Sequence, residues 1–328
     1  MTQASISIGL SAAIVSVEKE NPSALVVAHA DSEDALPFGP FDPESQRTLE
    51  QGLRKWVSEQ TRFDLGYTEQ LYTFGDRGRH LPTAQPDDAN GARVVSVGYL
   101  ALTRQSEDDP GPGKRETRWR PWYHYFPWED WRDAKPPMID AEILPRLKNF
   151  VKSAANPQAA ELRRERVRLS FGADGVAWDE EKVLERYELL YEAGLVEESR
   201  RNSGRPTSRN EAGRNESGML GAAMMYDHRR ILATAIARLR GKMKYRPVVF
   251  ELMAPSFTLL ELQRTVEALQ GRRLHKQNFR RLVAEQGLVE GTGKFAPSAR
   301  GRPAELFRFR RDVLRERPAP GLRLGIRR

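Results

Sequence analysis

One short segment near the C-terminus carries side chains suited to reading DNA bases. Over residues 275–285, Phe279 and Val283 fall on one helical face, so Gln277 and Arg281 point away from that face. Arginine can make a bidentate contact with guanine, and glutamine can make one with adenine. The spacing therefore predicts a helix that enters the major groove. Its predicted DNA-contacting residues are Lys276, Gln277, Asn278, Arg280 and Arg281.

A second helix and a hairpin must position this reading helix. Thr258 and Glu261 form a capping box that begins the earlier helix, and Gly271 ends that helix. Residues 288–309 have the pattern of a hairpin, or wing, whose basic residues can meet phosphates. The order helix, break, helix and wing predicts a winged helix-turn-helix domain over residues 244–328. Outside the reading helix, the predicted DNA-binding residues are Thr258, Lys294, Arg300 and Arg302.

Charge is divided unevenly along the chain. Residues 229–328 hold 24 Lys/Arg and 8 Asp/Glu, a net charge of +16, while the other residues hold 29 and 37, a net charge of −8. A basic module on an acidic body is typical of a DNA-binding domain attached to a part that does not bind DNA. One alternative stays open for the module, a basic helical domain that binds RNA or an acidic protein.

The composition excludes several classes of site. The 328 residues include no cysteine, which excludes disulfides, thiol catalysis and cysteine–zinc sites and fits a reducing cytoplasm. The five histidines show no metal-ligand spacing. No apolar run approaches the roughly 20 residues that cross a bilayer. We therefore expect a cytoplasmic protein with no membrane partner, and a chain of this length suggests about two domains.

The first part of the chain, residues 1–240, alternates short apolar runs with amphipathic segments, which indicates an α+β fold. Residues 119–131 are dense in aromatic side chains, which suits a stacking platform but is more typical of a core. Residues 199–218 have few apolar side chains and are expected to form a flexible loop. The predicted strands are 6–17, 24–28, 67–74 and 93–103, and the predicted helices are 44–60, 139–151, 178–195 and 226–243.

The segment that ends at residue 63 resembles the Nudix box in outline. That box reads G-x5-E-x7-R-E-U-x-E-E-x-G-U, with U aliphatic, and its helix directs carboxylates at Mg²⁺, which bridges a diphosphate and activates water. In this chain Glu59 keeps one ligand position and Gln60 replaces the next, while the turn glycine, Gly39, lies two residues too far upstream. The first Glu and the Arg-Glu pair of the box are replaced by Arg47, Lys55 and Trp56.

These replacements bring positive charge to the place where a cation would bind. The sequence therefore predicts a degenerate Nudix-like body with no catalytic residue, no metal site and no hydrolase activity. Glu59 is the residual metal candidate, and Glu44 and Glu50 would supply ligands only in another register. An ordinary amphipathic helix without any ligand role is the alternative interpretation of this segment.

A degenerate Nudix-like domain followed by a winged helix resembles the NrtR group of Nudix-related transcriptional regulators of NAD metabolism. The segments LRKWVSEQT, RVVSVGYLALT, FTLLELQRTVEALQG, KQNFRRLV and GRPAELFRF occur in the order of that family. Inserted helices at about 139–200 make the chain similar to the long NadQ repressors. The resemblance implies a Nudix-like α/β/α sandwich, the sensor domain, over residues 1–240.

The same resemblance implies a function. It implies a homodimeric repressor that binds double-stranded operator DNA near NAD biosynthesis genes, requires no cofactor, and responds to ADP-ribose, NAD or ATP. For such a repressor we expect the helix at 226–243 to transmit nucleotide binding to the winged helices. Two alternatives stay open. One is an active Nudix pyrophosphohydrolase, acting on ADP-ribose or an NAD-like substrate, with an accessory nucleic-acid-binding domain; the other is an architectural DNA binder with a purely structural body.

A nucleotide site is expected just after the predicted strand 67–74. Basic side chains there can clamp phosphates while an aromatic ring stacks on adenine. A solvated basic loop is the alternative interpretation. The predicted nucleotide-binding residues are Tyr72, Phe74, Asp76, Arg77 and Arg79.

Overall fold

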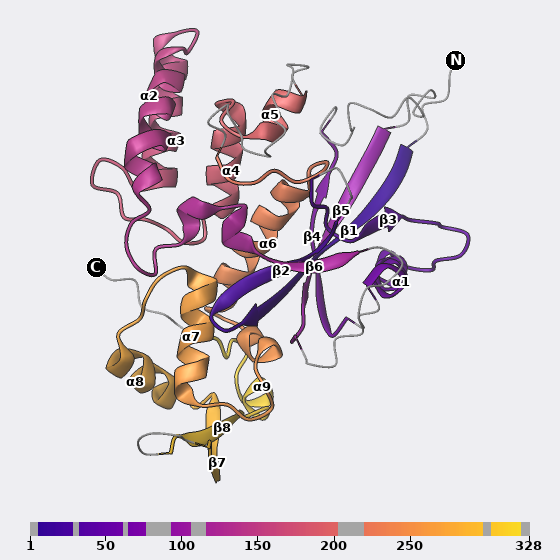
Figure 1. Ribbon diagram of the computed structural model, residues 1–328, viewed down its shortest axis with the longest axis vertical. Coiled ribbons are helices and arrows are strands. Elements are labelled where there is room, and N and C mark those ends of the chain that lie inside the picture. The colour runs from indigo at the N-terminus through magenta and orange to yellow at the C-terminus, as the bar shows by residue number, and fades with distance from the viewer. Residues whose placement is uncertain are drawn as a thin grey trace.

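A mixed β-sheet forms the centre of the body (Figure 1). The computed structural model describes residues 6–28, 33–61, 65–76, 93–105, 116–202, 220–297 and 303–322. The sheet has the strand order β4-β5-β1-β2-β6, and β3 also pairs with β1. β1 and β5 run parallel, and the other neighbours are antiparallel. The four predicted strands are confirmed. The strands are β1 (Ile6–Glu18), β2 (Asn21–Val27), β3 (Phe38–Pro40), β4 (Tyr67–Phe74), β5 (Arg93–Leu102) and β6 (Thr117–Pro121).

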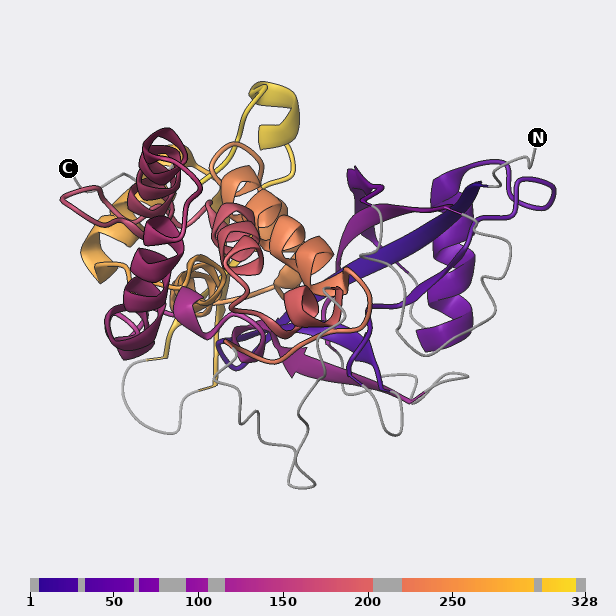
Figure 2. The same ribbon diagram turned by 90° about the horizontal axis from the view of Figure 1, so that it is seen from above.

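One helix, α1 (Leu49–Thr61), covers one face of this sheet, as Figure 2 shows. Its Leu53 and Val57 are buried against alternate residues of β1, which is why an i, i+4 apolar spacing forms a helix here. The prediction that this helix starts at residue 44 is wrong. Asp42 closes a turn at that point, because its carboxylate accepts from the backbone N–H of Glu44 at 3.0 Å.

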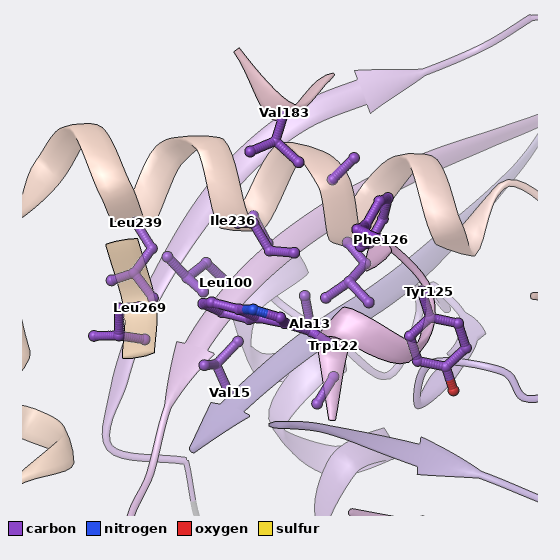
Figure 3. Packing of buried hydrophobic residues seen from close by; sticks show 14 of the residues in the cluster. Ala13, Val15, Leu100, Trp122, Tyr125, Phe126, Val183, Ile236, Leu239 and Leu269 are labelled. Carbon is purple, nitrogen blue, oxygen red and sulfur yellow. The ribbon is translucent and has the colours of Figure 1, made fainter. Parts of the chain in front are cut away.

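The opposite face is covered by α6 (His228–Lys242), α4 (Val183–Glu192) and the aromatic segment 119–131. Figure 3 shows the Trp122 ring between strands of the sheet and α6. The segment contains the short helices η1 (Trp122–His124) and η2 (Pro127–Glu129). It is core rather than a stacking platform, because four of its rings have no exposed surface: Trp122, Tyr125, Phe126 and Trp128. The body is therefore an α/β/α sandwich.

The inserted region is a set of helices beside α6. The predicted helix at 139–151 is confirmed as η3 (Ile139–Ile143) continued by α2 (Leu144–Lys152). The helix predicted from residue 178 begins later, as α4, because 178–182 is loop and turn. Sequence reasoning missed α3 (Pro157–Phe171), although an Asn156 N-cap followed by proline begins it. α5 (Glu197–Asn202) occupies the start of the expected loop 199–218, and residues 203–219 lie outside the described part.

The C-terminal module contains the predicted helix-turn-helix and wing. Its elements are η4 (Val248–Leu252), α7 (Leu259–Gln270), α8 (Lys276–Gln286), the hairpin β7 (Val289–Phe295) and β8 (Glu305–Phe309), and α9 (Val313–Glu316). One hydrophobic core runs from the sheet through α6 into α7 and α8. The module also bonds directly to the body, since the Tyr123 hydroxyl donates to the carbonyl of Ala268 at 2.6 Å. None of the helices in the described ranges is long and apolar enough to cross a membrane.

Candidate nucleic-acid interface and ligand cleft

The outer face of α8 is the candidate base-reading surface. Phe279 and Val283 are buried under it, as their spacing predicts. Arg281 is exposed over 72% of its side chain, and its Nε lies 3.7 Å from the Glu285 carboxylate one turn away. Exposed i, i+4 pairs contribute only about 0.3–0.5 kcal/mol, so this pair can open for a base. All five predicted residues of the helix are exposed: Lys276, Gln277, Asn278, Arg280 and Arg281.

A buried carboxylate fixes the angle between α7 and α8. Glu267 of α7 accepts from the side-chain amide of Gln263 at 2.8 Å and from the backbone N–H of Leu274 at 2.9 Å. Its second oxygen accepts from Arg273 at 3.1 Å. Gly271 turns the chain with φ +71°, and a Cβ on it would lie 2.3 Å from the carbonyl oxygen of Glu129. The turn is therefore held from inside the module and also by the body.

The other predicted DNA contacts have mixed outcomes. The Thr258 hydroxyl accepts from the backbone N–H of Glu261 at 3.2 Å, and the Glu261 carboxylate accepts from the backbone N–H of Thr258 at 2.7 Å, so the capping box is confirmed. Lys294 is exposed on β7 of the wing. Arg300 and Arg302 lie outside the described residues. Contact of these side chains with DNA stays a prediction.

A polar cleft of about 310 Å³ lies between the start of α1 and the strands β4 and β5. In its lining the Glu50 carboxylate accepts from Arg54 at 2.9 Å and from the Thr68 hydroxyl at 2.9 Å. The hydrogen bond from Arg54 lowers the pKa of Glu50 most, and the one from Thr68 lowers it further. Burial raises the pKa of Tyr99, which also lines the cleft, so its hydroxyl stays neutral. The cleft thus offers hydroxyl and amide groups beside two already paired carboxylates, those of Glu50 and Glu69.

The box positions on α1 do not fit Mg²⁺. Gln60 is buried, and its amide both accepts from the backbone N–H of Phe38 at 3.2 Å and donates to the Phe38 carbonyl at 2.6 Å. Trp56 donates from its ring nitrogen to the carbonyl of Pro40 at 2.7 Å. Two positions that hold carboxylates in the Nudix box therefore bind the backbone of β3 instead. Glu59, the residual metal candidate, is half-buried, and the described residues contain no cluster of three potential metal ligands around it.

The structure describes three of the five predicted nucleotide-binding residues, and these three have different surroundings. The prediction that the Phe74 ring stacks on a nucleotide is wrong, because this side chain is 5% exposed and packs in the core beneath Arg230. Tyr72 is 53% exposed and lies under the guanidinium of Arg238. Asp76 is exposed and forms an ion pair with Arg230. Arg77 and Arg79 lie outside the described residues.

Comparisons with known proteins agree with this geometry. Residues 249–309 match the family described as the NrtR DNA-binding winged helix domain. The C-terminal module thus matches the NrtR winged helix over these residues. The matched range runs from η4 to the end of β8 and contains every predicted DNA-binding residue.

The chain is also similar to a curated protein over part of its length. The ADPR responsive transcriptional repressor NtrR of Acinetobacter baylyi is 43% identical over 86 residues, which are 26% of this chain and 34% of that protein. The match thus spans about a third of the length of the relative.

The NrtR likeness extends to the arrangement of the whole chain. The crystal structure of Shewanella oneidensis NrtR superposes with a TM-score of 0.50 and 19% identity, covering 93% of this chain and 95% of that one. The same protein in complex with a 27mer DNA gives a TM-score of 0.49 and 20% identity, with coverage of 93% and 94%. The fold is that of NrtR, a Nudix-like sandwich followed by a winged helix.

Proposed function

We propose that this chain is a transcriptional repressor that binds operator DNA through its NrtR winged helix and responds to ADP-ribose through its Nudix-like body. The observation that carries the proposal is the reading surface of α8, where exposed Gln277 and Arg281 lie on a helix whose opposite face is buried. The name of the Acinetobacter baylyi relative supports both repression and ADP-ribose as the effector, ahead of NAD or ATP.

The body is proposed to sense the nucleotide rather than hydrolyse it. Metal-assisted hydrolysis of a diphosphate needs several carboxylates that converge on a cation. Trp56 and Gln60 occupy two of those positions and are engaged with β3. We place the effector at the cleft between α1 and β4, where Thr68 and Gln70 offer hydrogen-bonding groups, and Arg77 and Arg79 remain candidates for phosphate contacts.

We further propose a homodimer that acts on genes of NAD biosynthesis. One winged helix reads a single half-site, whereas two related by a two-fold axis read a palindrome with much greater specificity. Light scattering of the purified chain should give twice the monomer mass, and a footprint should show two half-sites. A monomer on a single half-site would contradict this part of the proposal.

The central experiment compares operator DNA with random DNA at one salt concentration. Arg281→Ala should weaken operator binding by about 1–3 kcal/mol and change binding to random DNA much less, because a base contact is lost. Arg164→Ala on α3 is the matched control, since it removes the same charge from an exposed side chain outside the NrtR domain. Equal losses on both DNAs would reduce Arg281 to a phosphate contact.

The effector is tested on the wild-type chain. ADP-ribose should change operator affinity at fixed salt, whereas NAD and ATP serve as comparisons. No response to any nucleotide would favour an architectural DNA binder. Metal-dependent turnover of ADP-ribose that Glu59→Gln abolishes would instead identify a pyrophosphohydrolase.

A further inference from the structure

The turn between β1 and β2 is strained, and it contacts the C-terminal module, which is called the reading module below because it contains α8. The strands pair from Val15 with Ala24 to Glu18 with Asn21, which leaves a two-residue turn of Lys19 and Glu20. Both turn residues have positive φ angles, 46° and 68°. Such turns normally contain Asn-Gly, because a side chain at positive φ is disfavoured. Strain of this kind persists where the surroundings hold it, and it is often connected with function.

Three arginines hold the turn in place. Arg132, in the loop after η2, donates to the backbone carbonyl of Glu20. The Glu20 carboxylate pairs with Arg264 of α7 at 2.6 Å and with Arg273 at 3.2 Å. Arg273 lies in the turn that precedes α8, and it also binds the buried Glu267 that fixes the helix angle. One carboxylate of the body therefore holds both α7 and the turn that leads into α8.

The other end of the same hairpin reaches the ligand cleft. Ala12 of β1 lies beside Tyr99, which lines the cleft, and Gly9 to Ser11 pair with β3, which α1 holds. Glu20 lies eight positions after Ala12, a distance of up to about 26 Å at about 3.3 Å per residue. β1 is hydrogen-bonded to β5, β2 and β3, which makes it rigid. Figure 1 shows the β1–β2 hairpin reaching α7, which contacts both strands.

We propose that Glu20 is a positioning residue that sets the orientation of the recognition helix α8 from the body, and that the β1–β2 hairpin carries the effector signal to it. The transmission of the effector signal rests on the proposed function. The attachment of Glu20 to α7 and to the turn before α8 does not rest on it. A shift of α1 and β3 on nucleotide binding would move β1, and the paired arginines would pass that movement to α7 and to the turn before α8.

The first test measures the coupling between effector and operator. Glu20→Gln keeps the shape of the side chain and removes its charge, and at 30% exposure it is tolerated by the fold. The ratio of operator affinities with and without ADP-ribose, typically about 5–150-fold in allosteric proteins, should fall toward one. Affinity for ADP-ribose itself, measured by calorimetry on the full chain without DNA, should stay unchanged. Unaltered coupling in this variant would overturn the proposal.

Glu18→Gln is the matched control. It removes the same charge two residues earlier, from a side chain that pairs with Lys19 and is 55% exposed. Its coupling ratio should equal that of the wild type. Equal losses in Glu18→Gln and Glu20→Gln would show that net charge alone matters, and would also overturn the positioning role.

A second measurement is independent of any effector. Amide hydrogen exchange on the free chain should accelerate in residues 271–275 and the first turn of α8 in Glu20→Gln, and should not change in Glu18→Gln. If wild-type binding proves insensitive to every nucleotide, the proposed function fails while this exchange result still decides the attachment. Unchanged exchange in Glu20→Gln would refute it.

Discussion

A buried cluster of three charges joins the inserted helices, α6 and the reading module. Glu129 accepts from Arg186 at 2.6 and 2.8 Å and from Arg240 at 2.7 Å, and all three side chains are at most 1% exposed. Arg240 also donates to the carbonyl of Leu269 at the end of α7. We predict that Glu129→Gln, which keeps the shape of the side chain, is among the most destabilising single changes in this chain.

The magnitude follows from what the substitution leaves behind. Two guanidinium groups would stay buried with backbone carbonyls and the Trp178 ring as partners, but without a carboxylate. Removing one member of a buried ion cluster costs about 3–5 kcal/mol, because the remaining charge is uncompensated. That is a large part of a typical stability of about 5–15 kcal/mol. At roughly 2 °C per kcal/mol, the melting temperature should fall by about 6–10 °C.

Thermal and urea unfolding of the full chain at neutral pH measure the effect. Glu142→Gln is the control, since Glu142 pairs with Arg146 at 3.4 Å on the surface and is 47% exposed. Its free energy of unfolding should change by about 0.5 kcal/mol or less. If Glu129→Gln also lowered the free energy of unfolding by less than about 1 kcal/mol, the two buried guanidinium groups would not be uncompensated in the variant. That result would refute the reasoning.

Further predictions concern DNA binding, pH and backbone geometry. Lys276→Ala should lower the slope of log affinity against log salt by about one, measured on random DNA; an unchanged slope would exclude a phosphate contact. Burial, followed by the positive charge of Arg120, lowers the pKa of His124 in the folded chain. The unfolded chain therefore binds more protons, so the free energy of unfolding should fall as the pH drops below about 6.5. In His124→Gln this part of the pH dependence should vanish from urea midpoints. Gln60→Glu should destabilise the fold by about 1–3 kcal/mol, because a carboxylate cannot donate to the Phe38 carbonyl; equal midpoints in urea would contradict this. Gly271→Ala should lower both melting temperature and operator affinity, since its Cβ would overlap backbone; loss of neither would show that the turn relaxes.

The reading module could be predicted because its signals are local. A capping box, an i, i+4 apolar spacing and a glycine between two helices lie within about thirty residues of sequence. The structure confirms each of them, with Thr258 capping α7 and Gly271 in the left-handed conformation. The buried partners Gln263 and Glu267 were not predicted, because a polar residue on a helix gives no sign of burial.

The burial of Phe74 on β4 was not predicted, for a specific reason. Simple alternation places Tyr72 and Phe74 on one face of a strand. A shift in register between Gln70 and Thr73 breaks this alternation, so Tyr72 is exposed while Phe74 enters the core. A bulge depends on the partner strand, which the local pattern does not reveal. The role of Glu20 was beyond reach for a similar reason, because its partner Arg273 lies 253 residues away.

The replaced box positions connect α1 to the β1–β2 hairpin through β3. In the Nudix box those carboxylates would face a cation, but here Gln60 and Trp56 bind β3. β3 pairs with β1 between Gly9 and Ser11, and β1 ends at the turn whose Glu20 holds α7 and the turn before α8. A hydrolase would destroy the molecule that it measures, whereas a helix tied to β3 can transmit the presence of that molecule. In the proposed function, Trp56 and Gln60 therefore make α1 the first link between the cleft and the C-terminal module, because they attach this helix to β3.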